Sequence, residues 1–166
     1  QFKDVVRTIQ SRADYKGRDE NGEAIYKLST KPTLTFEGTV KLHGSNAGIS
    51  YTPADGVQAL KRSSLIGKEG LTAHFGFNSF VQVTNKDYFL KFMSGLWDNL
   101  GCIPSEQLTI YGEWAGKGVQ SGVGVSFLEK AFFVFGAKIT IQGSEEEKWV
   151  DTSKLIFTAD NVYNIF

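Results

Sequence analysis

Residues 41–46 read Lys-Leu-His-Gly-Ser-Asn and bring a lysine, a histidine and an asparagine together around a glycine. A lysine amine becomes a nucleophile when burial or a nearby cation lowers its pKa. Gly44 lets the backbone turn or approach a ligand, and His43 and Asn46 can hydrogen-bond the group that Lys41 attacks. Apolar residues precede the stretch and an alternating segment follows it, which indicates strand, turn and strand. A hairpin with a solvated lysine is the alternative, because short motifs often match by chance.

The basic pair Lys61-Arg62 ends a predicted strand just before a glycine-containing loop. Two adjacent cations near Lys41 can bind phosphates and lower the pKa of its amine. A solvated pair at a strand end is the alternative.

Glu113 interrupts the otherwise apolar strand 107–114, between Gly112 and Trp114. A carboxylate there must accept hydrogen bonds or point into a cleft. A ribose diol is one partner that fits, and water is the alternative. The glycine-rich loop 115–124 follows, and its backbone can lie close to a ligand. It lacks the ending and the spacing of a Walker A sequence.

The apolar strand 131–141 contains three phenylalanines, Phe132, Phe133 and Phe135. Their rings offer faces on which a base can stack. Most aromatic residues in such a run belong to a core, so we expect at most one of the three to contact a ligand.

Composition restricts the classes of function. Apolar residues make up 41% of the 166 residues, charged residues 22%, and the formal net charge is zero. Bulk charge therefore does not indicate a nucleic-acid partner, and any phosphate site must be a local patch. The single cysteine, Cys102, excludes an intramolecular disulfide framework and a cysteine-based zinc site. Without a long apolar segment or a signal peptide, we expect an intracellular, cytoplasmic protein with no membrane partner.

The patterning predicts an α+β fold in one domain over 1–166, with many strands joined by turns. Strands are expected over 33–40, 46–52, 57–62, 107–114, 131–141 and 148–150. An amphipathic helix is expected within 80–100, ending at Gly101. The remaining expectations are a short helix or strand near residue 2, loops over 11–22 and 63–76, and a partly helical stretch over 153–166.

Taken together and in this order, these features resemble the covalent nucleotidyltransferase superfamily. In detail they are similar to ATP-dependent RNA ligases of the phage RNA ligase 2 and kinetoplastid editing-ligase type. Residues 41–46 resemble their motif I, K-x-H-G-x-N, whereas DNA ligases and capping enzymes usually carry K-x-D-G. Residues 61–62 resemble the Lys-Arg pair of motif Ia.

Two further motifs extend the resemblance along the chain. Residues 111–120, Tyr-Gly-Glu-Trp-Ala-Gly-Lys-Gly-Val-Gln, resemble motif III, F-G-E-x-A-G-x-G-x-Q. Residues 133–135 resemble motif IIIa, F-x-x-F-D, except that Gly136 stands where the aspartate is expected. The resemblance implies an antiparallel-sheet, ATP-grasp-like nucleotidyltransferase domain with a few flanking helices.

The resemblance also implies a reaction. Lys41 would attack the α-phosphorus of ATP to form lysyl-AMP, with Mg²⁺ neutralising the phosphates. The AMP would pass to an RNA 5′-phosphate, which a 3′-OH would then join. The implied nucleotide-binding residues are Val40, Lys41, His43, Asn46, Arg62, Glu113 and Phe135. Lys61 and Gln120 would contact phosphate or RNA, and no residue is assigned to metal.

The family's motifs IV and V should lie beyond motif IIIa, and neither is recognisable before residue 166. We therefore expect a C-terminally incomplete domain with little activity of its own. The alternatives are a DNA ligase or capping-type nucleotidyltransferase, a non-catalytic nucleotide- or RNA-binding module, and an α+β domain with chance motifs. The oligomeric state stays open.

Overall fold

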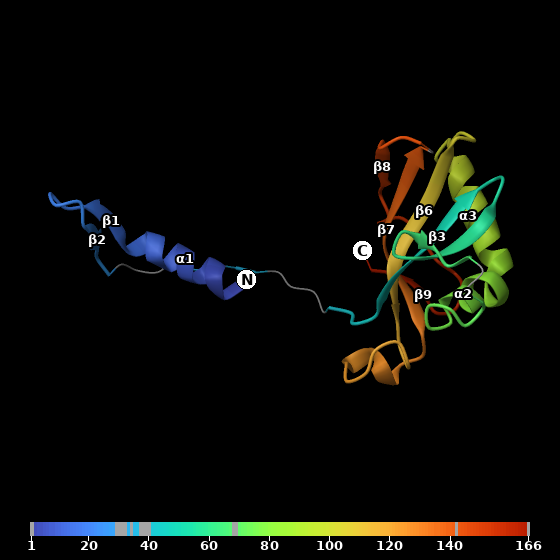
Figure 1. Cartoon of the computed structure of the whole chain (residues 1–166), viewed down its shortest axis with the longest axis horizontal. Coiled ribbons are helices and arrows are strands. Elements are labelled where there is room, and N and C mark those ends of the chain that lie inside the picture. Colours follow the sequence, from blue (N-terminus) through green and yellow to red (C-terminus); the bar gives the residue numbers. More distant parts are fainter. Residues whose placement is uncertain are drawn as a thin grey trace. The chain divides into compact units, whose positions relative to one another are not determined.

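The computed structural model describes residues 2–28, 33, 35–36, 41–67, 70–141 and 143–165. Its contacts divide the chain into two compact units, residues 1–40 and residues 41–166 (Figure 1). Each unit is described by itself. The predicted strand 33–40 falls mostly outside the described residues, and so does the predicted nucleotide-binding residue Val40.

The first unit contains helix α1 (Phe2–Asp14) and a hairpin of β1 (Tyr15–Arg18) and β2 (Ala24–Tyr26). The carboxylate of Asp19 closes the hairpin, because its Oδ1 accepts the backbone N–H groups of Asn21 and Glu23. A loop over 11–22 was therefore a wrong prediction. Hydrogen bonds within the turn stabilise the hairpin. Its strands lack the alternation of apolar and polar residues by which a strand is predicted from sequence.

The second unit is built on a seven-stranded sheet with the order β5-β4-β3-β6-β7-β8 and with β9 also paired to β7 (Figure 1). The strands are β3 Ser45–Thr52, β4 Gly56–Lys61, β5 Ser64–Leu65, β6 Glu106–Ala115, β7 Ala131–Ile141, β8 Glu147–Val150 and β9 Val162–Asn164. All neighbours are antiparallel except β7 and β9. The α+β class with an antiparallel sheet is confirmed, as are the five strands predicted between 46 and 150.

Strands β8 and β9 share one edge of β7. Val162 to Asn164 pair with residues 132–134, and Glu147 to Val150 pair with residues 137–140. Residues 135 and 136 lie between these two pairings.

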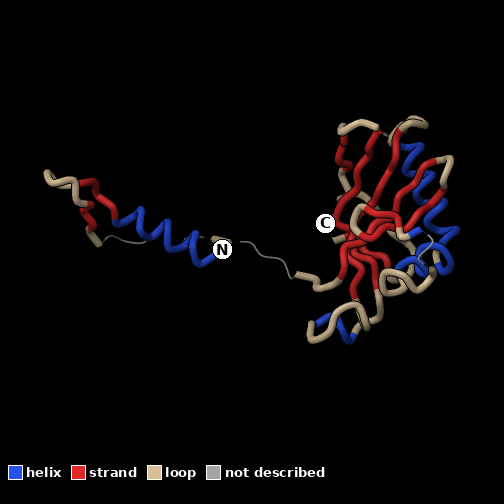
Figure 2. The backbone as a smooth tube through the Cα atoms, viewed as in Figure 1, coloured by secondary structure: helices blue, strands red, loops and turns tan. Residues whose placement is uncertain are grey.

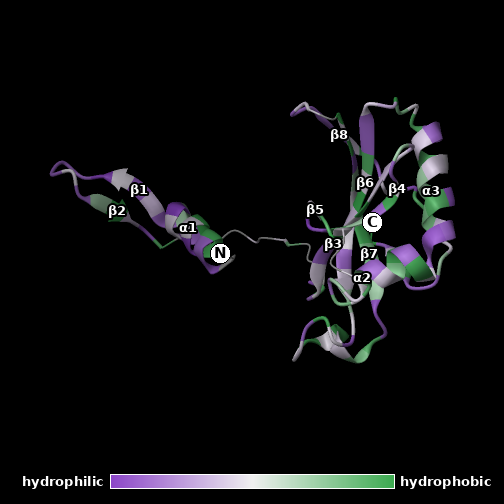
Figure 3. Cartoon of the chain, turned by 45° about the vertical axis from the view of Figure 1, so that its right-hand side comes forward, coloured by the Kyte–Doolittle hydropathy of each residue, from purple (hydrophilic) through white to green (hydrophobic). Residues whose placement is uncertain are grey.

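Helix α3 (Lys86–Asn99) packs on one face of this sheet. Phe89, Met93 and Trp97 recur at every fourth position and are buried. Hydrophilic and hydrophobic residues alternate along the rest of the helix (Figure 3), and Phe92 and Leu96 also pack against the core. The Trp97 ring meets that of Tyr51 on β3 edge-on at 5.7 Å. Burying side chains of this size stabilises the fold by about 1.5–3 kcal/mol each. The helix ends at Asn99, and the predicted stop Gly101 lies two residues beyond it with a left-handed φ of 66°.

Among its described residues the unit also contains three short helical segments: α2 Phe77–Ser79, η2 Phe80–Thr84 and η3 Gly124–Phe127. The last belongs to the excursion 116–130 between β6 and β7, which projects past the end of the sheet (Figure 2). No helix in the described ranges is long and apolar enough to cross a membrane.

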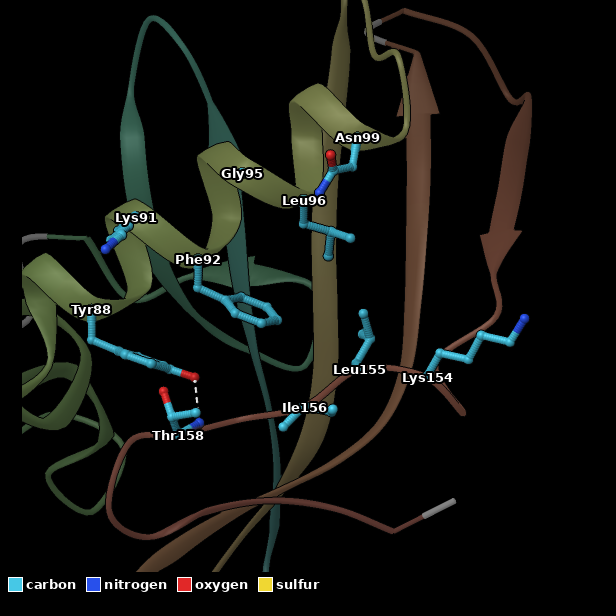
Figure 4. A pocket seen from close by; sticks show the side chains of 10 residues that line it. All are labelled: Tyr88, Lys91, Phe92, Gly95, Leu96, Asn99, Lys154, Leu155, Ile156 and Thr158. Carbon is cyan, nitrogen blue, oxygen red and sulfur yellow. Dashed lines mark hydrogen bonds between the residues drawn. The ribbon is translucent and has the colours of Figure 1, made fainter.

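The stretch 153–166 was predicted to be partly helical, which is wrong for its described residues. It runs without helix along α3, where the Thr158 N–H donates to the Tyr88 hydroxyl at 3.0 Å (Figure 4). The Phe157 ring packs 4.8 Å from that of Phe92. These contacts with α3, followed by the pairing of β9 with β7, replace a helix's own hydrogen bonds. A cavity remains between α3 and residues 154–158 (Figure 4).

Candidate functional site

Strand alternation separates the core from the other face of the sheet. Ala47, Ile49 and Tyr51 of β3 belong to the core with α3. Since successive side chains of a strand point to opposite faces, Asn46 faces away from α3. On β6 the same argument places Tyr111 and Glu113 on the face of Asn46, and Asn46 is the register partner of Glu113. This face carries the predicted site.

The turn at Gly44 is bound through both of its backbone groups. Its N–H donates to Glu113 Oε1 at 2.8 Å, and its carbonyl accepts from Gln120 Nε2 at 3.2 Å. A Cβ at this position would lie 2.8 Å from the Ala115 Cβ and 2.9 Å from the Glu113 Cγ. Glycine is required here by close approach to β6, and two residues predicted for the site fix the turn that follows Lys41.

A second turn brings in the basic pair. Arg62 has a φ of 54°, which is the left-handed region and costs a non-glycine residue about 1–2 kcal/mol. The turn is held because the Arg62 N–H donates to the Asn46 carbonyl at 3.1 Å. The same carbonyl lies 3.1 Å from the His74 Nε2, and His74 is also left-handed. Backbone strain of this kind collects at functional sites.

A β-bulge sets the position of Phe135. In the pairing of β6 with β7, Tyr111 is opposite Gly136 but Gly112 is opposite Val134, so Phe135 is the extra residue. A bulge of this kind re-aims a side chain out of the regular pleat. Phe132 and Val134 are fully buried, whereas Phe135 lines a cavity. Phe133 is half-buried and its ring stacks on that of Tyr163 at 5.5 Å, so Phe132 alone of the three belongs to the core. Phe135 is the one that the bulge places at this cavity.

Two adjacent cavities form a groove on this face, and Asn46, Arg62 and Ser63 line both. The aromatic half is also lined by Tyr111, Phe135, Lys138 and Trp149. The basic half is also lined by Gly44, Ser45, Lys61, Ser64 and His74. Their volumes, about 470 and 490 Å³, fall in the range of small-molecule sites.

The structure brings together most of the residues that the sequence singles out. Asn46, Lys61, Arg62 and Phe135 line the groove, and Glu113 and Gln120 bind Gly44 at its border. Lys41 and His43 are exposed and line neither cavity.

Sequence reasoning missed several residues that line the groove, namely Ser63, His74, Tyr111, Lys138 and Trp149. Tyr111 was open to prediction, because it precedes Glu113 by two positions and so shares its face. The others depend on turns and pairings that carry no local signal.

Lys138 links strands β7 and β8 within the aromatic half. Its Nζ lies 2.6 Å from the Glu147 Oε2 and 5.8 and 5.7 Å from the ring centres of Tyr111 and Trp149. The hydrogen bond between the two side chains raises the pKa of Lys138 and lowers the pKa of Glu147. Both groups are therefore held in their charged forms.

A model of the RNA ligase family matches residues 34–164, a range that contains every predicted site residue. The chain belongs to the RNA ligase family. A search of curated proteins found no significant match. Family membership confirms the resemblance at the level of RNA ligases and indicates RNA ligase function in general. The finer type, the lysyl-AMP mechanism and the single incomplete domain stay predictions.

Proposed function

We propose that this chain is the adenylation part of an ATP-dependent RNA ligase of the phage RNA ligase 2 and editing-ligase type. The observation that carries the proposal is the groove itself. In a member of the RNA ligase family, Asn46, Lys61, Arg62 and Phe135 come from separate strands and turns to line it. The family also favours RNA joining over DNA joining or capping.

The two halves of the groove suit the two ends of ATP. The aromatic half would take the base, with Phe135 stacking on it. The basic half would take the phosphates, with Lys61 and Arg62 as cations and the serine hydroxyls as donors. Glu113 would accept from the ribose hydroxyls, since one of its oxygens binds Gly44 and a carboxylate has two.

Lys41 would supply the nucleophile in its neutral amine form. Its Nζ would form a bond to the α-phosphorus while the bond from that phosphorus to the bridging oxygen breaks. Pyrophosphate leaves, and the amine loses a proton. The bound turn at Gly44, three residues further on, would restrict where the amine can lie.

Two transfers would complete the sealing of RNA. An oxygen of an RNA 5′-phosphate would attack the AMP phosphorus and displace the lysine nitrogen. A 3′-OH would then attack the activated 5′-phosphorus, so that a phosphodiester forms, AMP leaves and the hydroxyl proton is released. Gln120 and Lys61 would lie on the side of the RNA end.

Magnesium is assigned no protein ligands. Among the described residues, no three His, Cys, Asp or Glu side chains are grouped so that they can hold a metal ion. The described residues therefore do not fit a magnesium ion coordinated by protein side chains alone. We derive no step through it, although Mg²⁺ commonly binds through substrate phosphates.

Mass spectrometry of the full-length protein after incubation with ATP and Mg²⁺ tests the proposal. We expect an AMP adduct on Lys41 that is absent from Lys41→Ala. Lys91→Ala is the matched control, because Lys91 is an exposed lysine on α3 that lines the cavity shown in Figure 4. The adduct should survive in it.

Three outcomes contradict the proposal. An adduct on another residue removes Lys41 as the nucleophile, and a preference for GTP indicates a capping-type enzyme. Thermal stabilisation by ATP without any adduct indicates a non-catalytic binding module.

A further inference from the structure

We propose that Trp149 is a base-contacting residue of the groove and that its indole forms the wall next to Phe135 against which the purine of ATP lies. The inference rests on the proposed function, and it adds a residue for which the motifs of the resemblance provide no counterpart. It starts from the unusual exposure of this tryptophan.

Trp149 differs from the other two tryptophans of the chain. Trp97 and Trp114 are 5% and 2% exposed, whereas Trp149 is 60% exposed. A large aromatic side chain normally contributes to stability through burial. An indole that is held at the border of a cavity but left open to solvent is typical of a binding surface.

The indole is held in place by its neighbours. A Cβ on Gly136 would lie 3.2 Å from the Trp149 Cζ3, so the ring rests on the glycine that follows Phe135. The Tyr111 ring lies 6.4 Å away, and the Lys138 ammonium lies over the indole at 5.7 Å. A ring positioned before the ligand arrives loses less conformational freedom on binding.

The chemistry of this half favours a base over a phosphate. Tyr111, Phe135 and Trp149 present three aromatic rings to the cavity, and the charge of Lys138 is compensated by Glu147 at 2.6 Å. Lys61 lines only the basic half, and Arg62 lies at the junction and lines both halves. A nucleotide has the same polarity, with a flat base at one end and phosphates at the other.

The absence of a side chain at Gly136 also supports a position of the Trp149 indole beside Phe135. The family pattern places an aspartate at this position, and any side chain there would meet the indole. Glycine at 136 thus leaves room for Trp149 to lie against the bulge that positions Phe135. Gly136→Ala should displace the ring without removing it.

Fluorescence of the full chain tests the inference, with α,β-methylene-ATP as the probe because it cannot transfer AMP. Acrylamide should quench mainly the fluorescence of the exposed Trp149. Bound analogue should reduce this quenching, whereas tripolyphosphate should leave it unchanged. Stacking on one base corresponds to roughly a tenfold effect on the dissociation constant. Trp149→Ala lacks this fluorophore, so its affinities are measured by isothermal titration calorimetry beside wild type. The variant should bind the analogue about tenfold more weakly and tripolyphosphate equally well.

Two further variants complete the test. Trp149→Phe should recover most of the affinity, and Gly136→Ala should fall between wild type and Trp149→Ala. Ile156→Ala, at a residue that is 80% exposed and lines the other cavity, is the control and should bind like wild type.

The outcomes separate this inference from the proposed function. If wild type binds the analogue and Trp149→Ala binds it equally well, only the role of Trp149 is refuted. If single-stranded oligoadenylate protects the indole and the analogue does not, Trp149 contacts RNA and the inference is wrong. If wild type binds no analogue at all, the inference and the proposed function fall together.

Discussion

Replacing Gly44 with alanine should destabilise the unit 41–166 by about 3 kcal/mol. The added Cβ would lie 2.8 Å from the Ala115 Cβ and 2.9 Å from the Glu113 Cγ, against an optimum of about 3.5–4.0 Å between carbons. Overpacking of this kind costs about 1–3 kcal/mol. The backbone must move by several tenths of an ångström, which also weakens the hydrogen bond to the Glu113 carboxylate, a bond worth about 1.5–3 kcal/mol.

Urea unfolding followed by tryptophan fluorescence measures this loss. All three tryptophans lie within 41–166, so the signal reports on that unit. The midpoint should fall by about 1–3 M at unchanged slope. Gly95→Ala is the control, because a Cβ there meets nothing within 4 Å and should stabilise α3 by about 0.5–1 kcal/mol. Equal midpoints for wild type and Gly44→Ala would refute the argument from close approach.

Three other predictions concern packing, capping and charge. Phe89→Ala should cost about 3–5 kcal/mol in urea unfolding, since Phe89 is fully buried; a loss below 1 kcal/mol would contradict its place in the core. Gly101→Ala should cost about 1 kcal/mol, because Gly101 has a φ of 66°, and an unchanged midpoint would exclude that strain. The lowered pKa of Glu147 means that its bond to Lys138 stabilises the fold above the unfolded pKa of about 4.3 and is lost as the pH falls through the lower folded value. The raised pKa of Lys138 means that this stability is lost again only as the pH rises beyond about 10.4. Glu147→Gln should therefore have a lower free energy of unfolding than wild type between about pH 4.3 and about pH 10.4, and the same free energy in strong acid. A difference that persists in strong acid would show that the bond to Lys138 is not its cause.

Much of the sheet was predictable because its strands carry a regular signal. Alternation over 46–52 and the long apolar run 131–141 matched β3 and β7 closely. The helical spacing of Phe89, Met93 and Trp97 likewise matched α3. In each case the local sequence pattern and the tertiary packing favour the same element, so the element could be predicted from the pattern.

The groove was predictable only in part. Motif spacing singled out Asn46, Arg62 and Phe135, but the bulge that aims Phe135 arises from a register shift between two strands. No pattern within either strand marks such a shift. The contact of Trp149 with Gly136 arises in the same way from the pairing of β8 with β7, and the segment 153–166 was mistaken because contacts with α3 outweigh its local preference.

The shared edge of β7 links completion of the groove to the order in which the chain is made. Phe135 and Gly136 lie between the residues paired with β9 and those paired with β8. On a ribosome, residues 137–140 can pair with β8 first, whereas residues 132–134 on the other side of the bulge stay unpaired on this edge until residue 164 has emerged. A ligand that binds only the finished groove would then favour molecules in which both strands have docked.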